Sequence, residues 1–344
     1  MKNLKIKNQK PVLTKEGSKI KNALLCLLVG MFCVSCTLQS GSLSSAQGTT
    51  GDVLIVMSDY HWKGPCGDSI RSYFSEIVMG LPAPEPMFDL MQLSSLSAFM
   101  QRFRSIVNVN IDPGYEMAKL GVKSDVYAKH QLIFTLDAPS ADSAIACMYR
   151  NKDLIIGSFL LKGRDAIIDD YKRSVAKQMV EHLREKYQVD IVIPGSYSLD
   201  MEKDDFVWMG RLEGDREYGI LMWKEPYLRT SQLETDSLIF KMNAMTRRYV
   251  PGNIPGSYMA DEPTVPPVVR RFEKNGVYSV QMNGLWQMEN GFMGGPYVSQ
   301  TIVDLKRAQL VTAHGFVFYP NRDKRQMVRQ LEAILHTMMP VEED

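Results

Sequence analysis

The chain has 344 residues, of which 45% are hydrophobic and 23% are charged. This composition excludes an intrinsically disordered protein, and the length is enough for one large domain or two ordinary ones. The formal net charge of +1 excludes the strongly basic balance that is typical of nucleic-acid-binding proteins.

The first 36 residues have the pattern of an export signal. Seven lysines precede an apolar run at 23–34. These twelve residues are fewer than the roughly 20 needed to span a bilayer, but they suit a secretory signal peptide. Ser35 and Cys36 follow, and a small residue directly before a cysteine resembles the lipobox of bacterial lipoproteins, although Cys33 stands where that pattern usually has leucine. By this resemblance, cleavage would precede Cys36 and its sulfur would carry the lipid; the alternative is an ordinary signal peptide that is cut elsewhere.

Residues 1–35 are therefore predicted to be a lipoprotein signal peptide, and residues 36–50, rich in Ser, Gly and Gln, a flexible tether. The signal contains seven of the 40 basic residues and one of the 39 acidic residues, which leaves 33 basic and 38 acidic residues and a net charge of −5. An acidic body argues against nucleic acid as a partner. The partner expected instead is a membrane, reached through the acyl anchor, and the expected location is the periplasmic face of the outer membrane.

Residues 51–200 alternate strand and helix patterns, which predicts an N-terminal α/β-like lobe. Strands are expected at 52–57, 87–93, 105–111, 130–136 and 189–193, and helices at 68–79 and 94–103. A helical region is expected to begin at Ser140. Its second part has the clearest amphipathic repeat of the chain, formed by Ile167, Tyr171, Val175, Met179 and Leu183.

Residues 201–344 favour strands, and the predicted class of the whole chain is α+β with two lobes. Asn275-Gly276 lies between two strand patterns and is the strongest short hairpin signal in the sequence. Hairpins are expected to pair 206–212 with 218–223, 268–273 with 277–282, and 298–304 with 309–319, and helices are expected at 231–247 and 323–337. The C-terminal lobe is thus predicted to be a mostly antiparallel sheet with helices packed on one face.

Residues 284–301 contain four glycines, one proline and three aromatic residues between two strand patterns. Glycine lets a ligand or another backbone approach closely, and aromatic faces can hold a sugar ring, a peptide or an acyl chain. The ligand-binding candidates here are Tyr258, Trp286, Met293, Gly294, Gly295 and Tyr297. The alternative is a packed strand corner whose aromatic side chains fill the core.

The start of the last predicted helix has an unfavourable charge pattern. Arg322, Lys324 and Arg325 lie where the helix macrodipole is already positive. A bound anion or a carboxylate from elsewhere in the fold would relieve this repulsion, and the free N–H groups of a helix start bind anions. Lys324 and Arg325 are therefore candidates for an anionic ligand, with salt bridges to Asp323 or to loop acids as the alternative.

The sequence contains none of the common enzyme signatures, such as Gly-x-Ser-x-Gly, His-Glu-x-x-His or a phosphate-binding glycine loop. Its five histidines lie far apart without metal-ligand spacing, so neither a metal nor another cofactor is expected. Cys66 precedes a predicted helix, where the dipole favours a thiolate, but no base lies near it in the sequence. Cys66 and Cys147 could pair in an oxidising compartment or remain two buried thiols.

These patterns favour a non-catalytic envelope protein that binds a glycan, a peptide, an anionic envelope ligand or a protein partner at residues 284–301. No catalytic residue is assigned. A rival hypothesis is an envelope glycan hydrolase in which Glu289 acts with Asp261 or Asp304. It requires two carboxyl groups on one cleft, roughly 5–9 Å apart.

Motifs spread over the predicted mature body support a family resemblance. They are Trp62, Gly67-Asp68, Leu81-Pro-Ala-Pro-Glu-Pro86, Gly256-Ser-Tyr-Met259, Gly284-Leu-Trp286, Met293-Gly-Gly-Pro-Tyr-Val-Ser299, Gly315-Phe-Val-Phe-Tyr-Pro320, Asp323-Lys-Arg325 and Arg329-Gln-Leu-Glu332. Together they resemble the lipoprotein family known as domain of unknown function 4837, typical of Bacteroidota, over nearly the whole mature body. The resemblance implies a lipid-anchored envelope protein. It implies no catalytic residue, because the family carries no assigned reaction.

Overall fold

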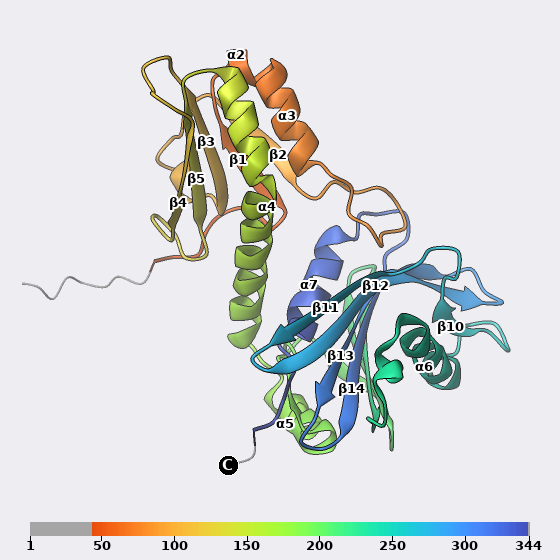
Figure 1. The fold of residues 1–344 in the computed structure, drawn as a ribbon. Coiled ribbons are helices and arrows are strands. Elements are labelled where there is room, and N and C mark those ends of the chain that lie inside the picture. The colour runs from red at the N-terminus through yellow and green to blue at the C-terminus, as the bar shows by residue number, and fades with distance from the viewer. Residues whose placement is uncertain (1–42, 343–344) are drawn as a thin grey trace, which may run out of the picture. The chain divides into compact units, whose positions relative to one another are not determined.

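The computed structural model describes residues 43–342 (Figure 1). The compact unit that begins at Ser45 contains two large β-sheets, and the fold below is that of this unit. The predicted signal peptide and the lipid-attachment candidate Cys36 lie outside the described residues, as does the first part of the predicted tether. Within residues 43–342, no helix is both long enough and apolar enough to cross a bilayer.

The first sheet has five strands in the order β2-β1-β3-β5-β4. Its elements are β1 (Asp52–Val56), α2 (Asp59–Trp62), α3 (Pro65–Phe74), β2 (Asp89–Leu93), η2 (Met100–Arg102), β3 (Ser105–Ile111), β4 (Lys119–Ser124), β5 (Leu132–Ala138) and α4 (Ala141–Lys172). All pairs are parallel except the antiparallel pair of β4 with β5. Side chains of α3 and α4 fill the core on one face with Val53 and Ile55, whereas Leu54 belongs to a smaller cluster on the other face.

The second sheet is antiparallel, with the strand order β10-β12-β13-β14-β9-β8-β7 and with β11 paired to β12. Its strands are β7 (Ser198–Lys203), β8 (Phe206–Glu213), β9 (Arg216–Pro226), β10 (Tyr258–Asp261), β11 (Val268–Lys274), β12 (Val277–Glu289), β13 (Gly294–Asp304) and β14 (Gln309–Phe318). The hairpin predicted at Asn275-Gly276 is confirmed. Both residues have positive φ, 50° and 78°, as the favoured two-residue hairpin turn requires.

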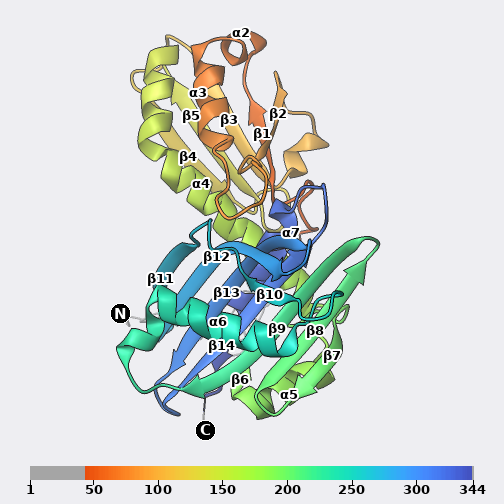
Figure 2. The same cartoon turned by 90° about the vertical axis from the view of Figure 1, so that its right-hand side faces the viewer.

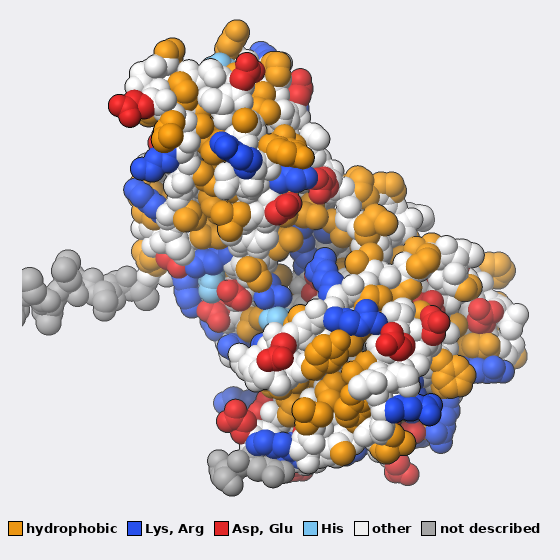
Figure 3. Space-filling view, in the orientation of Figure 1, with side chains coloured by type: hydrophobic (Ala, Val, Ile, Leu, Met, Phe, Trp, Pro, Cys, Tyr) orange, Lys and Arg blue, Asp and Glu red, His pale blue; other side chains and the backbone are white. Residues whose placement is uncertain are grey.

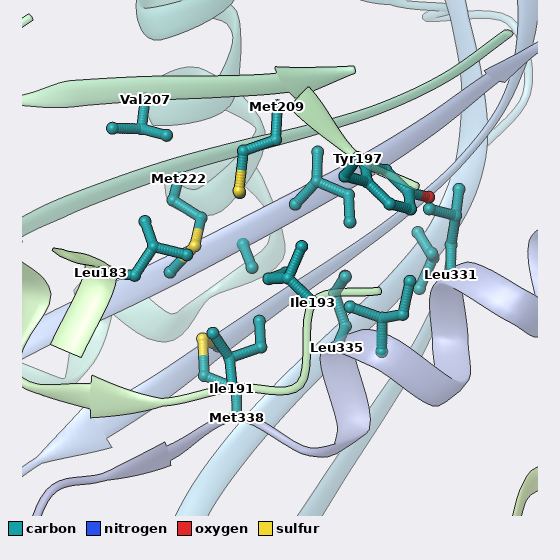
Figure 4. Close-up of a cluster of buried hydrophobic side chains, with 14 of the residues drawn as sticks. Leu183, Ile191, Ile193, Tyr197, Val207, Met209, Met222, Leu331, Leu335 and Met338 are labelled. Carbon is teal, nitrogen blue, oxygen red and sulfur yellow. The ribbon is translucent and has the colours of Figure 1, made fainter. Parts of the chain in front are cut away.

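Helices cover both faces of the second sheet, whereas the sequence predicted cover on one face (Figure 2). The helices are α5 (Lys177–Tyr187), α6 (Thr235–Tyr249) and α7 (Arg325–His336). On one face, α5 and α7 bury Leu183 and Leu335 against Met222 of the sheet (Figure 4). On the other face, α6 buries Met242 beside Trp286. Both faces need cover because β13 and β14 are buried at almost every position. The α+β class predicted from the sequence is confirmed.

The amphipathic helix predicted around residues 167–183 is interrupted. The chain leaves the helical path after α4 and resumes it in α5. In between, the backbone pairs with a later segment: the Ala176 N–H donates to Ile193 O at 2.9 Å, and the Gly195 N–H donates to Ser174 O at 2.7 Å. Side chains of residues 177–193 then pack with the second sheet, although the sequence groups them with residues 51–200. A four-residue repeat cannot reveal this break, because both helices keep an apolar face.

Several other segments differ from their predictions. Helix α3 ends at Phe74 because the chain then follows the loop that leads to β2, and residues 94–103 contain only the short helix η2. Strand β4 was not predicted, since most of its side chains are exposed and polar or small. The strand expected at 189–193 is reduced to β6 (Val189–Asp190), which pairs with β15 (Met339–Pro340). Helix α6 is preceded by the short helix η3 (Thr230–Leu233).

Candidate functional site

Residues 284–301 form the end of β12, the following turn and the first part of β13. The Trp286 side chain is 2% exposed, and its indole Nε1 donates a hydrogen bond to Val317 O at 3.2 Å. Its ring meets the ring of Phe316 edge to face, with 5.7 Å between centroids. A Cβ added to Gly295 would lie 2.1 Å from Val317 O, so this glycine allows two backbones to approach closely. The protein itself therefore occupies the space beside both residues.

Two further aromatic candidates also have partners within the fold. Tyr297 is 0% exposed, and its hydroxyl donates to Asp261 Oδ1 at 2.6 Å. Burial raises the pKa of the Asp261 carboxyl, an effect that the Tyr297 hydrogen bond opposes. Tyr258 is half-buried, and the guanidinium of Arg247 lies 4.9 Å from the centre of its ring.

The last two ligand-binding candidates, Met293 and Gly294, lie at the edge of the core that contains Trp286. Met293 is half-buried beside the core cluster, and Gly294 is exposed at the start of β13. A Cβ on Gly294 would lie 2.9 Å from Trp286 O, so this glycine too allows close contact between strands. None of the candidates in this segment lines the cavities described below. The structure gives them a packing role in a strand corner, and a ligand role for them stays a prediction.

The three carboxylates of the hydrolase hypothesis do not face one cleft. Asp261 is the strand partner of Trp286, and directly paired residues share one face of a sheet. Glu289 lies three positions after Trp286 on β12, so strand alternation places it on the opposite face. Asp304 lies at the far end of β13, roughly 30 Å from its start at about 3.3 Å per residue. It forms an ion pair with Arg307 at 3.0 Å.

The start of α7 is held by acidic residues from the loop between α3 and β2 and from β2 itself. The Glu85 carboxylate, which is 4% exposed, accepts the backbone N–H of Lys324 at 2.7 Å and that of Arg325 at 2.8 Å. The Arg325 guanidinium donates to Asp89 at 2.5 Å and to Pro86 O. Carboxylates from elsewhere in the fold thus relieve the positive charge at this helix start, as one of the two sequence hypotheses required.

A cavity of about 650 Å³ lies beside this helix start, and we call it the apolar cavity. Its walls come from the loop before β2 and from α4, β11, β12 and α7, and Figure 3 shows the hollow with hydrophobic and basic side chains at its edge. Its apolar lining residues are Ile77, Val78, Met79, Leu81, Met87, Leu160, Leu161, Ile167, Val268 and Val328. Gly157 belongs to the α4 wall, and a Cβ there would meet nothing within 4 Å.

Four arginines line the apolar cavity, and two of them have structural partners. Arg329 donates to Thr50 O at 3.1 Å and to Met87 O at 2.6 Å. Burial, and to a smaller extent the charge of Arg325, lower the pKa of Arg329 to about 10. Arg325 is bound to its acidic and backbone partners at the start of α7. These two arginines therefore hold the cavity wall together.

The side chains of the other two arginines, Arg164 on α4 and the exposed Arg270 on β11, make no hydrogen bond or ion pair within residues 43–342. The Nε of Arg164 is buried without a partner. Burial is the largest effect on the pKa of Arg164 and lowers it; the charge of Arg270 lowers it too, whereas Asp165 and Glu332 raise it. Two guanidinium groups thus present unpaired positive charge to a cavity with apolar walls.

The acids of this cavity do not neutralise that charge. Glu332 accepts hydrogen bonds from Asn283 Nδ2 at 2.7 Å and from Gln281 Nε2 at 3.3 Å. Glu76 forms an ion pair with Lys152 at 3.3 Å. Because two acids stand against four arginines, the lining carries a formal charge of +2. The cavity is therefore suited to an anion that also carries an apolar part.

Cys66 and Cys147 are buried and are not paired with each other. Burial raises the pKa of the Cys66 thiol, so the thiolate that a helix start would favour is disfavoured here. Of the two cysteine hypotheses, the structure agrees with two buried thiols. Among the described residues there is no cluster of three or more His, Cys, Asp or Glu side chains that could hold a metal ion.

The sequence did not single out Arg164, Arg270 or Gly157. A signal for Arg164 is present, because it lies four residues after Leu160 and so places a charge on the inward side of α4. Arg270 has no such signal, since Arg270 and Arg271 resemble any exposed part of an edge strand. Only the fold brings β11 and α4 to the same cavity.

Two family models match the chain. Residues 176–337 match the family described as Domain of unknown function (DUF4837), and residues 46–172 match the family described as Domain of unknown function (DUF8532). The resemblance to the first family, expected over nearly the whole mature body, is therefore confirmed for the second half only. Among curated proteins, none matches this chain.

Comparison with solved structures finds remote similarities. The Ran-binding protein Mog1p of Saccharomyces cerevisiae is similar at 9% identity and a TM-score of 0.33, over 45% of this chain and 91% of that one. LpqN, involved in cell envelope biogenesis of Mycobacterium tuberculosis, is similar at 12% identity and a TM-score of 0.27, over 44% of this chain and 83% of that one. Human StAR-related lipid transfer protein 5 is similar at 11% identity and a TM-score of 0.24, over 52% and 96% of the two chains. These values are too low to transfer a function.

Proposed function

We propose that this protein is a non-catalytic binding protein of the cell envelope, held to a membrane by a lipid on Cys36. Its ligand is a single-chain amphiphilic anion that occupies the apolar cavity. The observation that carries this proposal is the pair of unpaired guanidinium groups, Arg164 and Arg270, on a cavity with apolar walls. The lipobox-like pattern at Ser35-Cys36 supports the anchor, and the location that we propose with it is the periplasmic face of the outer membrane.

The two parts of the cavity match the two parts of such a ligand. An apolar chain gains about 0.8 kcal/mol for each CH₂ group that it buries against the apolar walls. A carboxylate or phosphate group accepts charge-assisted hydrogen bonds from guanidinium groups, which are roughly twice as strong as neutral ones. Of the ligand classes expected from the sequence, the apolar walls favour an anionic amphiphile over a glycan or a hydrophilic peptide.

Filling the cavity tests whether it is the binding site. The Gly157→Leu substitution places a side chain in the open space beside α4, where a Cβ meets no atom within 4 Å. We expect it to reduce dodecanoate binding at least tenfold in isothermal titration calorimetry while the thermal midpoint stays equal or rises. The matched control is Asp153→Leu, at an exposed position of the same helix outside the cavity lining. Equal dodecanoate affinities of Gly157→Leu and the control would contradict the proposal.

Neighbouring arginines of β11 test the charge requirement. Arg270 lines the apolar cavity, whereas Arg271 faces the other way and lies 3.7 Å from Glu234. We expect Arg270→Gln to weaken dodecanoate binding about tenfold, which corresponds to 1.4 kcal/mol, and Arg271→Gln to leave it unchanged. Binding of dodecan-1-ol, which has no charge, should be the same in both variants. A similar loss for the alcohol would show that Arg270 shapes the wall and does not pair with an anion.

The anchor has its own test. Metabolic labelling with a fatty acid should label the wild-type chain, and Cys36→Ser should abolish the label and move the protein out of the membrane fraction. Cys26→Ser, in the apolar run and outside the lipobox-like positions, is the matched control and should remain labelled. Labelling that survives in Cys36→Ser would exclude this residue as the attachment site without affecting the cavity proposal.

A further inference from the structure

A second cavity, of about 430 Å³, lies at the C-terminal turns of α4, and we call it the polar cavity. Its lining residues are Ser45, Thr50, Arg104, His130, Ala166, Ile167, Asp170, Tyr171, Arg173, Arg211 and Gln330. It shares Thr50 and Ile167 with the apolar cavity but has few apolar side chains of its own. Three arginines from separate parts of the chain meet here, which neither the sequence hypotheses nor the proposed function uses.

Arg104 is the most informative of these arginines. Its Nε and Nη1 atoms are buried and have no hydrogen-bond partner within residues 43–342. The one hydrogen bond of its side chain within residues 43–342 runs from Nη2 to Ala46 O at 3.3 Å. Burial lowers the pKa of Arg104, while Asp170 and Asp52 raise it without forming an ion pair with it. A guanidinium with two desolvated and unpaired nitrogens is costly unless an acceptor reaches it.

The other two arginines are already oriented by partners. Arg211 donates to Glu213 and, at 3.3 Å, to Gln330 Oε1, and its guanidinium lies 4.5 Å from the ring centre of Tyr218. Arg173, at the end of α4, pairs with Asp170. Arg211 is therefore held in place at the cavity before any ligand arrives, which reduces the entropy lost on binding, whereas the pair of Arg173 with Asp170 is exposed to solvent.

The charge of the polar cavity selects the class of ligand. Three arginines and one lining acid, Asp170, give a formal charge of +2 with His130 neutral. Burial, the largest effect on the pKa of His130, lowers it, whereas the charge of Asp169 and its hydrogen bond to the imidazole raise it. The hydroxyl group of Ser45 adds a donor to the lining, whereas that of Thr50 already donates to Gln326 Oε1 at 3.1 Å.

We propose that the polar cavity binds a phosphate group, with the guanidinium groups of Arg104, Arg173 and Arg211 forming the site. Glu213, which pairs with Arg211 from outside the lining, reduces the formal charge of +2 to +1. The negative charge of a phosphate group offsets the remaining positive charge, and its oxygens accept N–H donors from guanidinium groups. The volume of about 430 Å³ exceeds that of the phosphate group alone, so the ligand is a phosphate monoester or a phosphorylated headgroup with room for its substituent. This site does not rest on the proposed function of the apolar cavity.

Phosphate binding is tested with the soluble body of the chain, residues 37–344, at constant ionic strength. Isothermal titration with inorganic phosphate should give binding that Arg104→Met weakens at least tenfold. The control Arg150→Met, at an exposed position of α4 that lines neither cavity, should bind as the wild type does. Arg104→Met should keep or raise the thermal midpoint, because it removes a buried unpaired charge. If it fails to fold, Arg173→Gln, at an exposed position, gives the same readout with an expected loss of about fivefold.

Further binding measurements identify the source of the phosphate group and distinguish binding at the polar cavity from binding at the apolar cavity. Binding to phosphatidic acid vesicles but not to phosphatidylcholine vesicles, lost in Arg104→Met, would identify a lipid headgroup; binding to glycerol phosphate alone would identify a soluble monoester. Gly157→Leu should leave phosphate binding intact, and Arg104→Met should leave dodecanoate binding intact. Absence of phosphate binding by the folded wild type, or equal binding by Arg104→Met, would overturn the phosphate site whatever the apolar cavity binds.

Discussion

The two segments that the sequence nominated as binding sites, residues 284–301 and the start of α7, have opposite environments. In the first segment, the polar atoms of Trp286 and Tyr297 bond to Val317 O and Asp261 inside the fold. At the start of α7, the backbone is satisfied by Glu85, but the same helix continues along a cavity with unpaired guanidinium groups. Unusual residues are thus not by themselves a site. What distinguishes a site is polar groups without partners next to open volume.

The first prediction concerns residues 284–301 and has the largest expected effect. A Cβ on Gly295 meets Val317 O at 2.1 Å, and both are backbone positions of paired strands. We expect Gly295→Val to lose more than about 4 kcal/mol of unfolding free energy, measured by urea denaturation. The control Gly157→Ala, whose Cβ meets open space, should gain about 0.5–1 kcal/mol from helix propensity. A stable Gly295→Val protein would show that the corner can open, and residues 284–301 would regain their place as a ligand site.

Removing the cap of α7 tests the other segment. In Glu85→Ala, two buried N–H groups, those of Lys324 and Arg325, lose their acceptor. We expect a loss of about 2–4 kcal/mol in urea denaturation, from unsatisfied donors and the uncompensated helix start. Glu76→Ala removes an acid of the same loop whose partner is the half-buried Lys152 and should change stability by less than about 1 kcal/mol. Equal effects of the two substitutions would mean that Glu85 is not a cap.

The stability of the protein at low pH is expected to depend on His314, a residue of β14 that packs against the segment 284–301. His314 packs 4.9 Å from Tyr297 with both ring nitrogens buried and unpartnered, and burial lowers its pKa to about 3. Because the unfolded chain takes up this proton near pH 6.5, stability is full above that pH and falls as the pH drops towards 3. The slope is about 1.4 kcal/mol per pH unit, or about 2 kcal/mol between pH 6.5 and 5. Urea denaturation at pH 6.5 and at pH 5 should show that His314→Phe loses about 2 kcal/mol less unfolding free energy between these pH values than the wild type does. An unchanged slope would place the acid sensitivity elsewhere, for example at His336, whose pKa is lowered to about 4.

The smallest effect is expected from the exposed charge beside α7. Arg322 is exposed and precedes the helix, where the macrodipole is positive. Arg322→Glu should raise the unfolding free energy by about 0.3–1 kcal/mol and should lose this gain at high salt. The same substitution should not change dodecanoate affinity, because Arg322 lies outside the apolar cavity lining. A tenfold change in affinity would instead extend the binding site to this residue.

Much of the fold follows from local patterns. The hairpin at Asn275-Gly276, the strands beside it and the amphipathic α7 were predictable, because turn chemistry and apolar periodicity act within a few residues. The break between α4 and α5 was not predictable. It depends on hydrogen bonds that join Ser174 and Ala176 to a segment about twenty residues later, at residues 193–195. The same limit applies to Glu85, whose partners lie more than two hundred residues later.

The sequence by itself determined the α+β class, the predicted export signal with Cys36, and the unfavourable charge at the start of α7, because composition and local periodicity carry that information. Only the tertiary structure decided which charges are paired. It placed Glu85 on α7, closed the strand corner around Trp286, and left the side chains of Arg164 and Arg270 and two nitrogens of Arg104 without partners within residues 43–342. The physical reason is that desolvation and pairing depend on distances between segments remote in the chain, and no pattern within one segment encodes those distances.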